Sequence, residues 1–427
     1  MSGSGRPRAI VLVIDRWGAP FSGPYGNTWL ETPACNELAN AGLLFEQAFV
    51  EGASLSDYYM QLWGNPRPTW SDHAPATPAD AGLLARLSAA GARSRLITDD
   101  ESISQLPLAA DFTTIELQPP PIVRRPARSI ERAAIARLLA TAWAQANSDD
   151  VEEELIWVHS RGMAAPWDAP PEFRQQFVDE DDPEPPVAVE PPEGPVPADS
   201  DPDLLQGWLW AYAAQVCLLD CCLQPWLESW RAKPAGERPL LILMGARGYP
   251  LGEHGYWGAA NERLHSELIH VPLFVLTGRP DDARFRSQTI VQLTDVRATL
   301  AHWLLPAGGD PPGGLLARVD GESAIVTDEV PRLAISRAGE ERAIRTSAWH
   351  VCYKQQPPTY DAGDATAGGA SDWQLYLKPD DRWEVNDVAD RCPDVLAAFR
   401  ELAQQLAAAE AQGQTAVIAK LAAELSE

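Results

Sequence analysis

The sequence predicts an α/β fold with a mainly parallel sheet. The first observation is a series of short apolar segments rich in β-branched residues, which are typical of strands buried on both faces: Arg8–Ile14, Leu43–Val50, Arg93–Thr98, Glu154–His159, Leu240–Met244 and Val271–Thr277. The second is a set of helical segments between these strands: Thr32–Gly42, Ala79–Gly91, Ile130–Gln145 and Leu204–Arg231. The third is size, because 427 residues with 45% hydrophobic content can form a large core.

The chain divides into two parts and an insertion. From Ile325 to Glu427 the sequence changes to short alternating strands and a terminal helical region that starts at Pro393. We therefore expect the chain to divide into an α/β domain at 1–324 and a smaller α+β subdomain at 325–427. Residues 179–203 are rich in Pro, Asp and Glu and contain no aromatic residue, so they predict an extended, solvated insertion. Residues 361–371, rich in Gly and Ala, predict a surface loop.

The charge balance excludes two classes of partner. Acidic residues outnumber basic ones 60 to 34, which gives a net charge of -26. Such a surface repels nucleic-acid phosphates and anionic lipids, so the expected partner is an anionic small molecule at a locally basic site, or a protein. No apolar segment is long enough to span a membrane, and the apolar segment after Arg8 is too short for a secretory signal. We expect a cytoplasmic protein.

Six segments, in order, carry a resemblance to a known family. They are Ile10–Asp15 (IVLVID), Tyr25–Asn27 (YGN) with Thr32 and Pro33, Leu44–Val50 (LFEQAFV), Leu251–Gly258 with Val271–Leu273, Ser287–Leu304, and Leu375–Asp390. Together they resemble the sulfatase branch of the alkaline phosphatase superfamily. The resemblance implies an alkaline-phosphatase-like sheet flanked by helices, and a family activity of metal-dependent ester hydrolysis.

The metal-binding positions depart from the family pattern. The resemblance implies two adjacent aspartates after the first strand and an Asp-His or Asp-Asn pair after a later strand. Here Asp15 is followed by Arg16, and Ala246 and Arg247 stand at the later pair. Only one carboxylate ligand position remains, whereas a hard cation needs several oxygen ligands. We therefore expect no metal, with Ca²⁺ or Mg²⁺ as the alternative if the site is intact, and Asp15 paired with Arg16 or Arg247.

The nucleophile and its supporting groups also differ. Ser54 aligns with the residue that the family converts to formylglycine, but Ser56 and Tyr58 replace the Pro and Arg of that motif. Ser54 could be an unmodified nucleophile, although a helix cap formed with Asp57 is the more ordinary role. His159, at the end of a predicted strand, is the candidate base, and a structural histidine is its alternative.

Three hypotheses follow. In the first, the chain is a pseudoenzyme, a sulfatase-like protein with a degenerate active site that lacks the metal and formylglycine site and is kept for binding. In the second, it hydrolyses sulfuric or phosphoric esters with Ser54 as nucleophile, His159 as base, and Arg16, Arg247 and His254 holding the anion. Pairing of the two arginines with nearby carboxylates would favour the first. A weaker third hypothesis gives the acidic insertion a role in tethering the chain to an assembly.

Overall fold

The computed structural model describes residues 7–64, 82–258, 263–305, 314–316, 333–355, 373–411 and 425. Its centre is an eight-stranded sheet in the order β10-β2-β9-β7-β1-β5-β3-β4. The strands are β1 (Ala9–Ile14), β2 (Leu43–Ala48), β3 (Ser94–Thr98), β4 (Thr114–Leu117), β5 (Leu155–Ser160), β7 (Leu240–Gly245), β9 (Leu273–Leu276) and β10 (Phe285–Val291). Only β9 is antiparallel to its two neighbours, so the predicted mainly parallel α/β sheet is confirmed.

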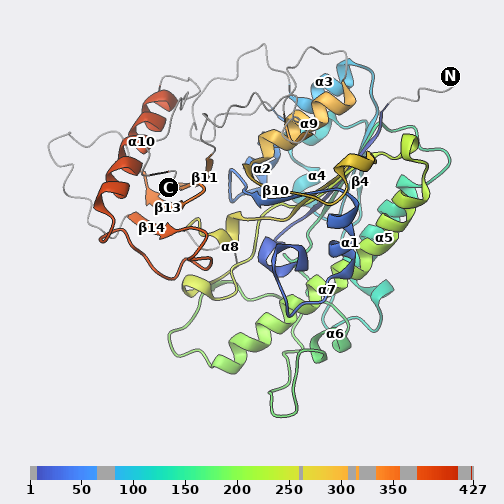
Figure 1. Cartoon of the computed structure of the whole chain (residues 1–427). Helices are drawn as coiled ribbons and strands as arrows, with labels where there is room; N and C mark the ends of the chain where they lie inside the picture. Colours follow the sequence, from blue (N-terminus) through green and yellow to red (C-terminus); the bar gives the residue numbers. More distant parts are fainter. Residues whose placement is uncertain are drawn as a thin grey trace.

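Helices cover both faces of this sheet (Figure 1). The longer ones are α1 (Pro33–Ala41), α2 (Leu55–Leu62), α3 (Leu83–Ala89), α5 (Ala134–Ala146), α7 (Pro202–Ala232) and α9 (Leu293–Leu304). Three short helices are α4 (Glu101–Ser104), α6 (Pro171–Gln175) and α8 (Ser266–Ile269). Alternate residues of β1 enter two separate cores, one shared with α2, α3 and α9 and the other with α1, α5 and α7. Burial on both faces explains why these strands are apolar throughout.

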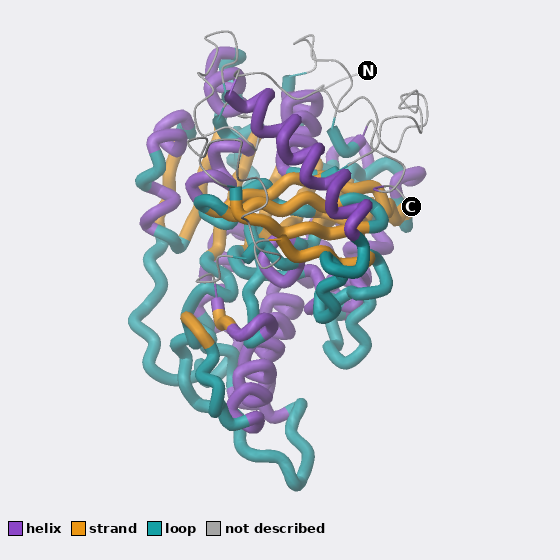
Figure 2. Tube along the Cα trace, turned by 90° about the vertical axis from the view of Figure 1, so that its left-hand side faces the viewer, coloured by secondary structure: helices purple, strands orange, loops and turns teal. Residues whose placement is uncertain are grey.

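A second unit follows in the chain. It is an antiparallel sheet in the order β11-β12-β13-β14, covered by α10 (Pro393–Ala411). The strands are β11 (Ala334–Ala338), β12 (Glu341–Arg345), β13 (Trp349–Lys354) and β14 (Trp373–Leu377). Figure 2 shows α10 running across this small sheet. The predicted α+β subdomain is therefore present, while the expected boundary at 324 and the loop at 361–371 lie outside the described residues.

Strands β4 and β10 have no counterpart in the sequence prediction. Both lie at the edges of the large sheet, and most of their residues are partly or fully exposed. Polar, half-exposed edge strands lack the apolar pattern that marks central ones. Within the described ranges, no helix combines the length and apolarity that a bilayer crossing requires.

Candidate functional site

The carboxyl ends of three adjacent strands bring the predicted charged residues together. Strand β1 lies between β5 and β7, with Ile14 opposite both Ser160 and Gly245. The next residue of the chain is Asp15, and its amide donates to the Ser160 carbonyl at 2.9 Å. Across β7 the Ala246 amide donates to the Ile14 carbonyl at 3.0 Å. This pairing places Asp15 beside the segment that carries Arg247.

Asp15 and Arg247 form a two-pronged ion pair. The Arg247 Nε donates to Asp15 Oδ1 at 2.9 Å, and Nη2 donates to Oδ2 at 3.1 Å. Asp15 is only 1% exposed. Burial opposes the charge on Arg247, but the Asp15 carboxylate raises the pKa of Arg247 above its usual value. The third guanidinium nitrogen donates to the Ala53 carbonyl at 2.9 Å, which ties the pair to the loop that precedes α2.

Arg16 is paired with the acidic insertion. Its backbone has a positive φ of 57°, an unusual conformation for a residue with a side chain. Its guanidinium forms an ion pair with Glu193 and lies 5.5 Å from the centre of the Tyr249 ring. The Arg16 Nε is buried without an acceptor. Arg16 and Arg247 therefore each have a carboxylate partner inside the chain.

The insertion is less solvated than its composition predicts. Most of its residues are exposed, but Val189 is buried, and the Tyr249 hydroxyl donates to the Pro192 carbonyl. Further along, β6 (Gly194–Pro195) pairs with β8 (Tyr256–Trp257). The predicted extended, solvated insertion therefore holds for most of its residues, while these contacts tie its second half to the large domain. No apolar pattern in this proline-rich, acidic segment marks its contact with the large domain, because the contact consists mainly of backbone hydrogen bonds and one ion pair.

Ser54 is the N-cap of α2. Its hydroxyl accepts from the Asp57 amide at 3.1 Å and donates to Asp57 Oδ2 at 2.7 Å. Ser54 is exposed, and its hydroxyl is engaged by these two contacts. The capping role predicted for Ser54 with Asp57 is confirmed.

His159 is fully buried and turned toward a tyrosine. Its Nδ1 is 2.6 Å from the hydroxyl of Tyr59, while its Nε2 is buried without a partner. Burial lowers the pKa of His159 to about 4. Within the described part of the chain no hydrogen bond joins His159 to Ser54, so the nucleophile–base contact of the second hypothesis is absent from this conformation.

His254 lies at the junction with the C-terminal unit. Its Nδ1 is 2.7 Å from Glu267 Oε1, and its Nε2 donates to the Glu384 carbonyl at 2.9 Å. Burial would lower the pKa of His254, but the bond to Glu267 and the nearby Glu384 raise it to about 9. The Nδ1 contact lies within the large domain and the Nε2 contact connects it to the C-terminal unit, and neither nitrogen contacts Arg16 or Arg247.

The residues at the end of β1 do not fit a Ca²⁺ or Mg²⁺ ion. Both carboxylate oxygens of Asp15 accept from Arg247, and Oδ1 also accepts from the Arg16 amide at 3.0 Å. Ala246 supplies no ligand atom, and a guanidinium repels a cation at this distance. The predicted loss of the metal site agrees with this geometry but remains a prediction.

A second group of metal-binding residue types occurs at His254, His265 and Glu267. The two imidazoles are stacked, with ring centres 3.6 Å apart and planes 1° from parallel. A metal ion lies in the plane of each imidazole that binds it, and two parallel planes at this separation share no such point. These side chains therefore do not fit a common metal in this arrangement.

Comparisons with known proteins identify the fold. No protein-family model and no curated protein matches the sequence. Among solved structures, the protein BT4656, in complex with its substrate D-glucosamine-2-N,6-O-disulfate, is similar with a TM-score of 0.67 and 14% identity, covering 96% of this chain and 98% of the other. A 2-O GAG sulfatase, BT1596, has a TM-score of 0.65 and 14% identity, with 95% and 93% covered.

A phosphonate monoester hydrolase of Agrobacterium radiobacter is also similar. Its TM-score is 0.64 at 15% identity, with 96% of each chain covered. The chain therefore has the alkaline-phosphatase-like fold of the sulfatases, over nearly its whole length, as the six sequence segments predict.

Proposed function

We propose that this chain, which has the sulfatase fold, is a binding protein and does not hydrolyse esters by the sulfatase route. The observation that carries the proposal is the ion pair between Asp15 and Arg247. A sulfatase of this fold would direct the Asp15 carboxylate toward a cation. Here that carboxylate is neutralised by a buried guanidinium through two hydrogen bonds of ordinary length.

The position of the nucleophile supports the same proposal. Ser54 lacks the Pro and Arg of the formylglycine motif, because Ser56 and Tyr58 stand there. Tyr58 is buried, and burial raises the pKa of its hydroxyl well above the usual value. A neutral phenol at that position cannot replace the charge of an arginine beside an anionic ester.

The candidate base supports it as well. With a pKa of about 4, His159 is neutral at physiological pH, but its Nδ1 is already bonded to Tyr59. The remaining nitrogen, Nε2, is buried and reaches no hydroxyl in the described chain. A general base must lie within hydrogen-bond reach of the proton that it removes, directly or through one water.

One observation keeps an arginine-based hydrolase as the second candidate. Arg247 donates to the carbonyl of Ala53, so its guanidinium lies next to the residue that precedes Ser54. An ester oxyanion held by Arg247 would then be near the Ser54 hydroxyl. This function requires Arg247 or Arg16 to exchange its carboxylate partner for the substrate.

Turnover assays test the proposal. Aryl sulfate, aryl phosphate and D-glucosamine-2-N,6-O-disulfate should each be incubated with the wild-type chain, with and without Ca²⁺. We expect no release above that of buffer, and no difference between wild type and Ser54→Ala. Ser56→Ala, at the second residue of the same helix, is the matched control. Hydrolysis that Ser54→Ala abolishes and Ser56→Ala preserves would establish the hydrolase instead.

A further inference from the structure

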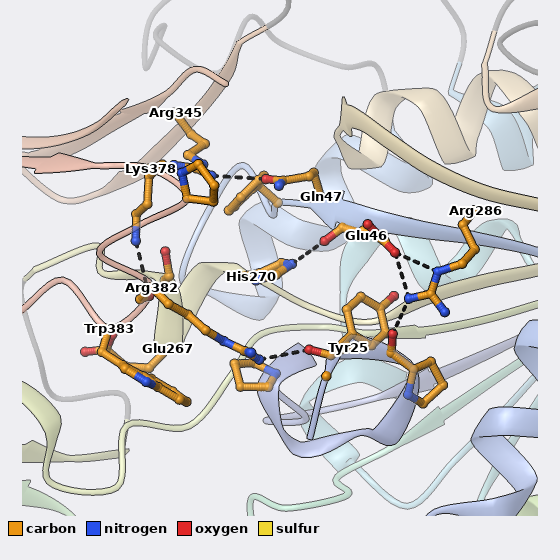
Figure 3. A pocket seen from close by; sticks show the side chains of 16 residues that line it. Tyr25, Glu46, Gln47, Glu267, His270, Arg286, Arg345, Lys378, Arg382 and Trp383 are labelled. Atoms are coloured by element: carbon orange, nitrogen blue, oxygen red, sulfur yellow. Dashed lines mark hydrogen bonds and ion pairs between the residues drawn. The ribbon is translucent and has the colours of Figure 1, made fainter. Parts of the chain in front are cut away.

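A pocket of about 360 Å³ lies where the C-terminal unit meets the large sheet. Figure 3 shows its two sides, which come from distant parts of the sequence. One side carries Tyr25, Glu46 and Gln47 from the large domain. The other side carries Arg345 from the end of β12, and Lys378, Arg382 and Trp383 from the segment after β14. We call this the seam pocket.

Most charges around the seam pocket cancel in pairs. Arg286 is paired with Glu46 at 2.7 Å, and Lys378 is paired with the buried Glu384 at 2.8 Å. The remaining lining carboxylate, Glu267, is paired with His254, which is a cation because its pKa is about 9. The pairs leave two arginines of the pocket wall, Arg345 and Arg382, without a carboxylate within ion-pair distance in the described chain.

Arg345 is the more deeply placed of the two. It is only 5% exposed, and its Nη2 donates to the Gln47 amide oxygen at 3.2 Å. Its Nε and Nη1 are buried without an acceptor. Burial lowers the pKa of Arg345 to about 10, and the negative charge of Glu384 partly offsets this effect. A buried guanidinium with two unsatisfied donors is costly, so an anionic acceptor at this wall would stabilise it.

Arg382 lies nearer the solvent. One of its nitrogens donates to the Tyr25 carbonyl at 2.9 Å, which is a neutral partner. Burial lowers its pKa, and no carboxylate offsets that effect. Its guanidinium lies 5.2 Å from the ring centre of Trp383. In a chain with a net charge of -26, two arginines without an ion-pair partner on one pocket are a local exception.

The other lining residues provide apolar and aromatic surface. Tyr25, Phe49 and Trp383 line the pocket together with Pro20, Pro24 and Pro379. Trp383 is 52% exposed, which leaves much of its indole free to contact a ligand. Flat aromatic and proline surfaces accept ring-shaped groups, and guanidinium groups accept oxyanions through paired hydrogen bonds.

We propose that the seam pocket binds a small ring-shaped ligand that carries a sulfate, phosphate or carboxylate group. The oxyanion lies against Arg345 and Arg382, and the ring lies against Tyr25 and Trp383. The volume accommodates a single sugar or aromatic ring with its anionic group. This site is separate from the end of β1, and the inference stands whether or not the chain hydrolyses esters.

Calorimetric titration of the full chain tests this site. The probes are phenyl sulfate, phenyl phosphate, benzoate and glucose 6-sulfate, with phenol, glucose and inorganic sulfate as controls for the ring and the anion alone. We expect saturable one-site binding of at least one ring-bearing anion, and weaker binding of all three controls. Arg382→Ala and Arg345→Gln should each weaken binding about tenfold or more, because each removes charged hydrogen bonds.

Two further variants locate the binding. Arg16→Ala alters the end of β1 and should leave the affinity unchanged. Arg400→Ala is the matched control for Arg382→Ala, because Arg400 also lies over a tryptophan of the C-terminal unit, Trp373, but not in the pocket. Absence of saturable binding up to about 10 mM, equal binding of phenol, unchanged affinity in Arg382→Ala, or loss of binding in Arg16→Ala would each overturn the proposal. If Arg345→Gln does not fold, Arg382→Ala decides the question.

Discussion

Two regions of this molecule each contain a pair of arginines, and the two pairs differ in their partners. At the carboxyl end of the large sheet, Arg247 binds Asp15 and Arg16 binds Glu193. In the seam pocket, the hydrogen-bond partners of Arg345 and Arg382 are uncharged, a side-chain amide and a backbone carbonyl. The arginines at the end of β1 thus have carboxylate partners, whereas the two arginines of the seam pocket have no carboxylate within ion-pair distance in the described chain.

Removing Arg247 should have the largest effect. Arg247→Leu leaves the carboxylate of Asp15 buried without its cation, and we expect a loss of about 3–5 kcal/mol in the free energy of unfolding, measured by urea denaturation. The double variant Asp15→Asn, Arg247→Leu should recover part of that loss, because no buried charge then remains.

The control is the exposed pair of Arg231 with Glu37, whose side chains are both about 42% exposed. Arg231→Leu should cost no more than about 1 kcal/mol. Equal losses for Arg247→Leu and Arg231→Leu would contradict the claim that the buried pair closes the site.

Substitution of Glu384, in the C-terminal unit, should have the second-largest effect on stability. Its carboxylate accepts from the Ser266 amide at 2.9 Å and from Lys378 at 2.8 Å, and it lies 3.1 Å from His265 Nδ1. Glu384→Gln keeps the shape but leaves the buried Lys378 ammonium without a counter-ion, so we expect a loss of about 2–4 kcal/mol. Asp380→Asn, an exposed change in the same turn, should be neutral. A neutral result for Glu384→Gln would mean that Glu384 does not hold the two units together.

Asp99, near the end of the large sheet, should make the free energy of unfolding depend on pH. It is buried, it accepts from the Arg161 amide at 2.7 Å, and burial raises its pKa to about 7. The ordinary pKa of this carboxyl is near 3.8. Between about pH 4 and 7 the carboxyl is therefore ionised in the unfolded chain but protonated in the folded chain. Its contribution to stability is therefore complete below pH 4 and is lost as the pH rises through 7.

The comparison with Asp99→Asn isolates this contribution. Between pH 4 and 8, the wild type should lose about 1–3 kcal/mol more than Asp99→Asn. Asp100→Asn, one residue along and still able to cap α4, should follow the wild type. Parallel curves for wild type and Asp99→Asn would show that Asp99 has a cation partner in solution.

The pair of Arg16 with Glu193 should have the smallest effect. Glu193 is 45% exposed, so Glu193→Gln should cost at most about 1 kcal/mol. Its main effect should be faster hydrogen exchange in residues 186–196, because the ion pair adds to the backbone hydrogen bonds that fix this segment. Glu190→Gln, in the same segment, is the control. Unchanged exchange in Glu193→Gln would mean that the backbone contacts alone hold the insertion.

The sequence predicted the central strands well and the charge partners only in part. Strands such as β1 and β7 are apolar throughout because both faces are buried, and that property is local. The pairing of Asp15 with an arginine could be predicted because the resemblance places Arg16 and Arg247 at ligand positions of the same site as Asp15. Glu193 lies 177 residues from Arg16, and no periodic pattern joins them.

The seam pocket could not be predicted for the same reason. Tyr25, Arg345 and Arg382 come from separate elements that only the packing of the C-terminal unit brings together. Their residue types carry no fixed spacing, so no motif marks them. The excess of acidic residues in the whole chain also conceals the local positive charge.

The most direct test of the account is a calorimetric titration of the full chain with Ca²⁺, repeated with Asp15→Asn. If the Asp15–Arg247 pair has replaced the cation, wild type and variant should give the same weak, unsaturated heats that any strongly acidic protein gives. Stoichiometric binding by the wild type, lost in Asp15→Asn, would contradict the account and show that the carboxylate exchanges Arg247 for a metal.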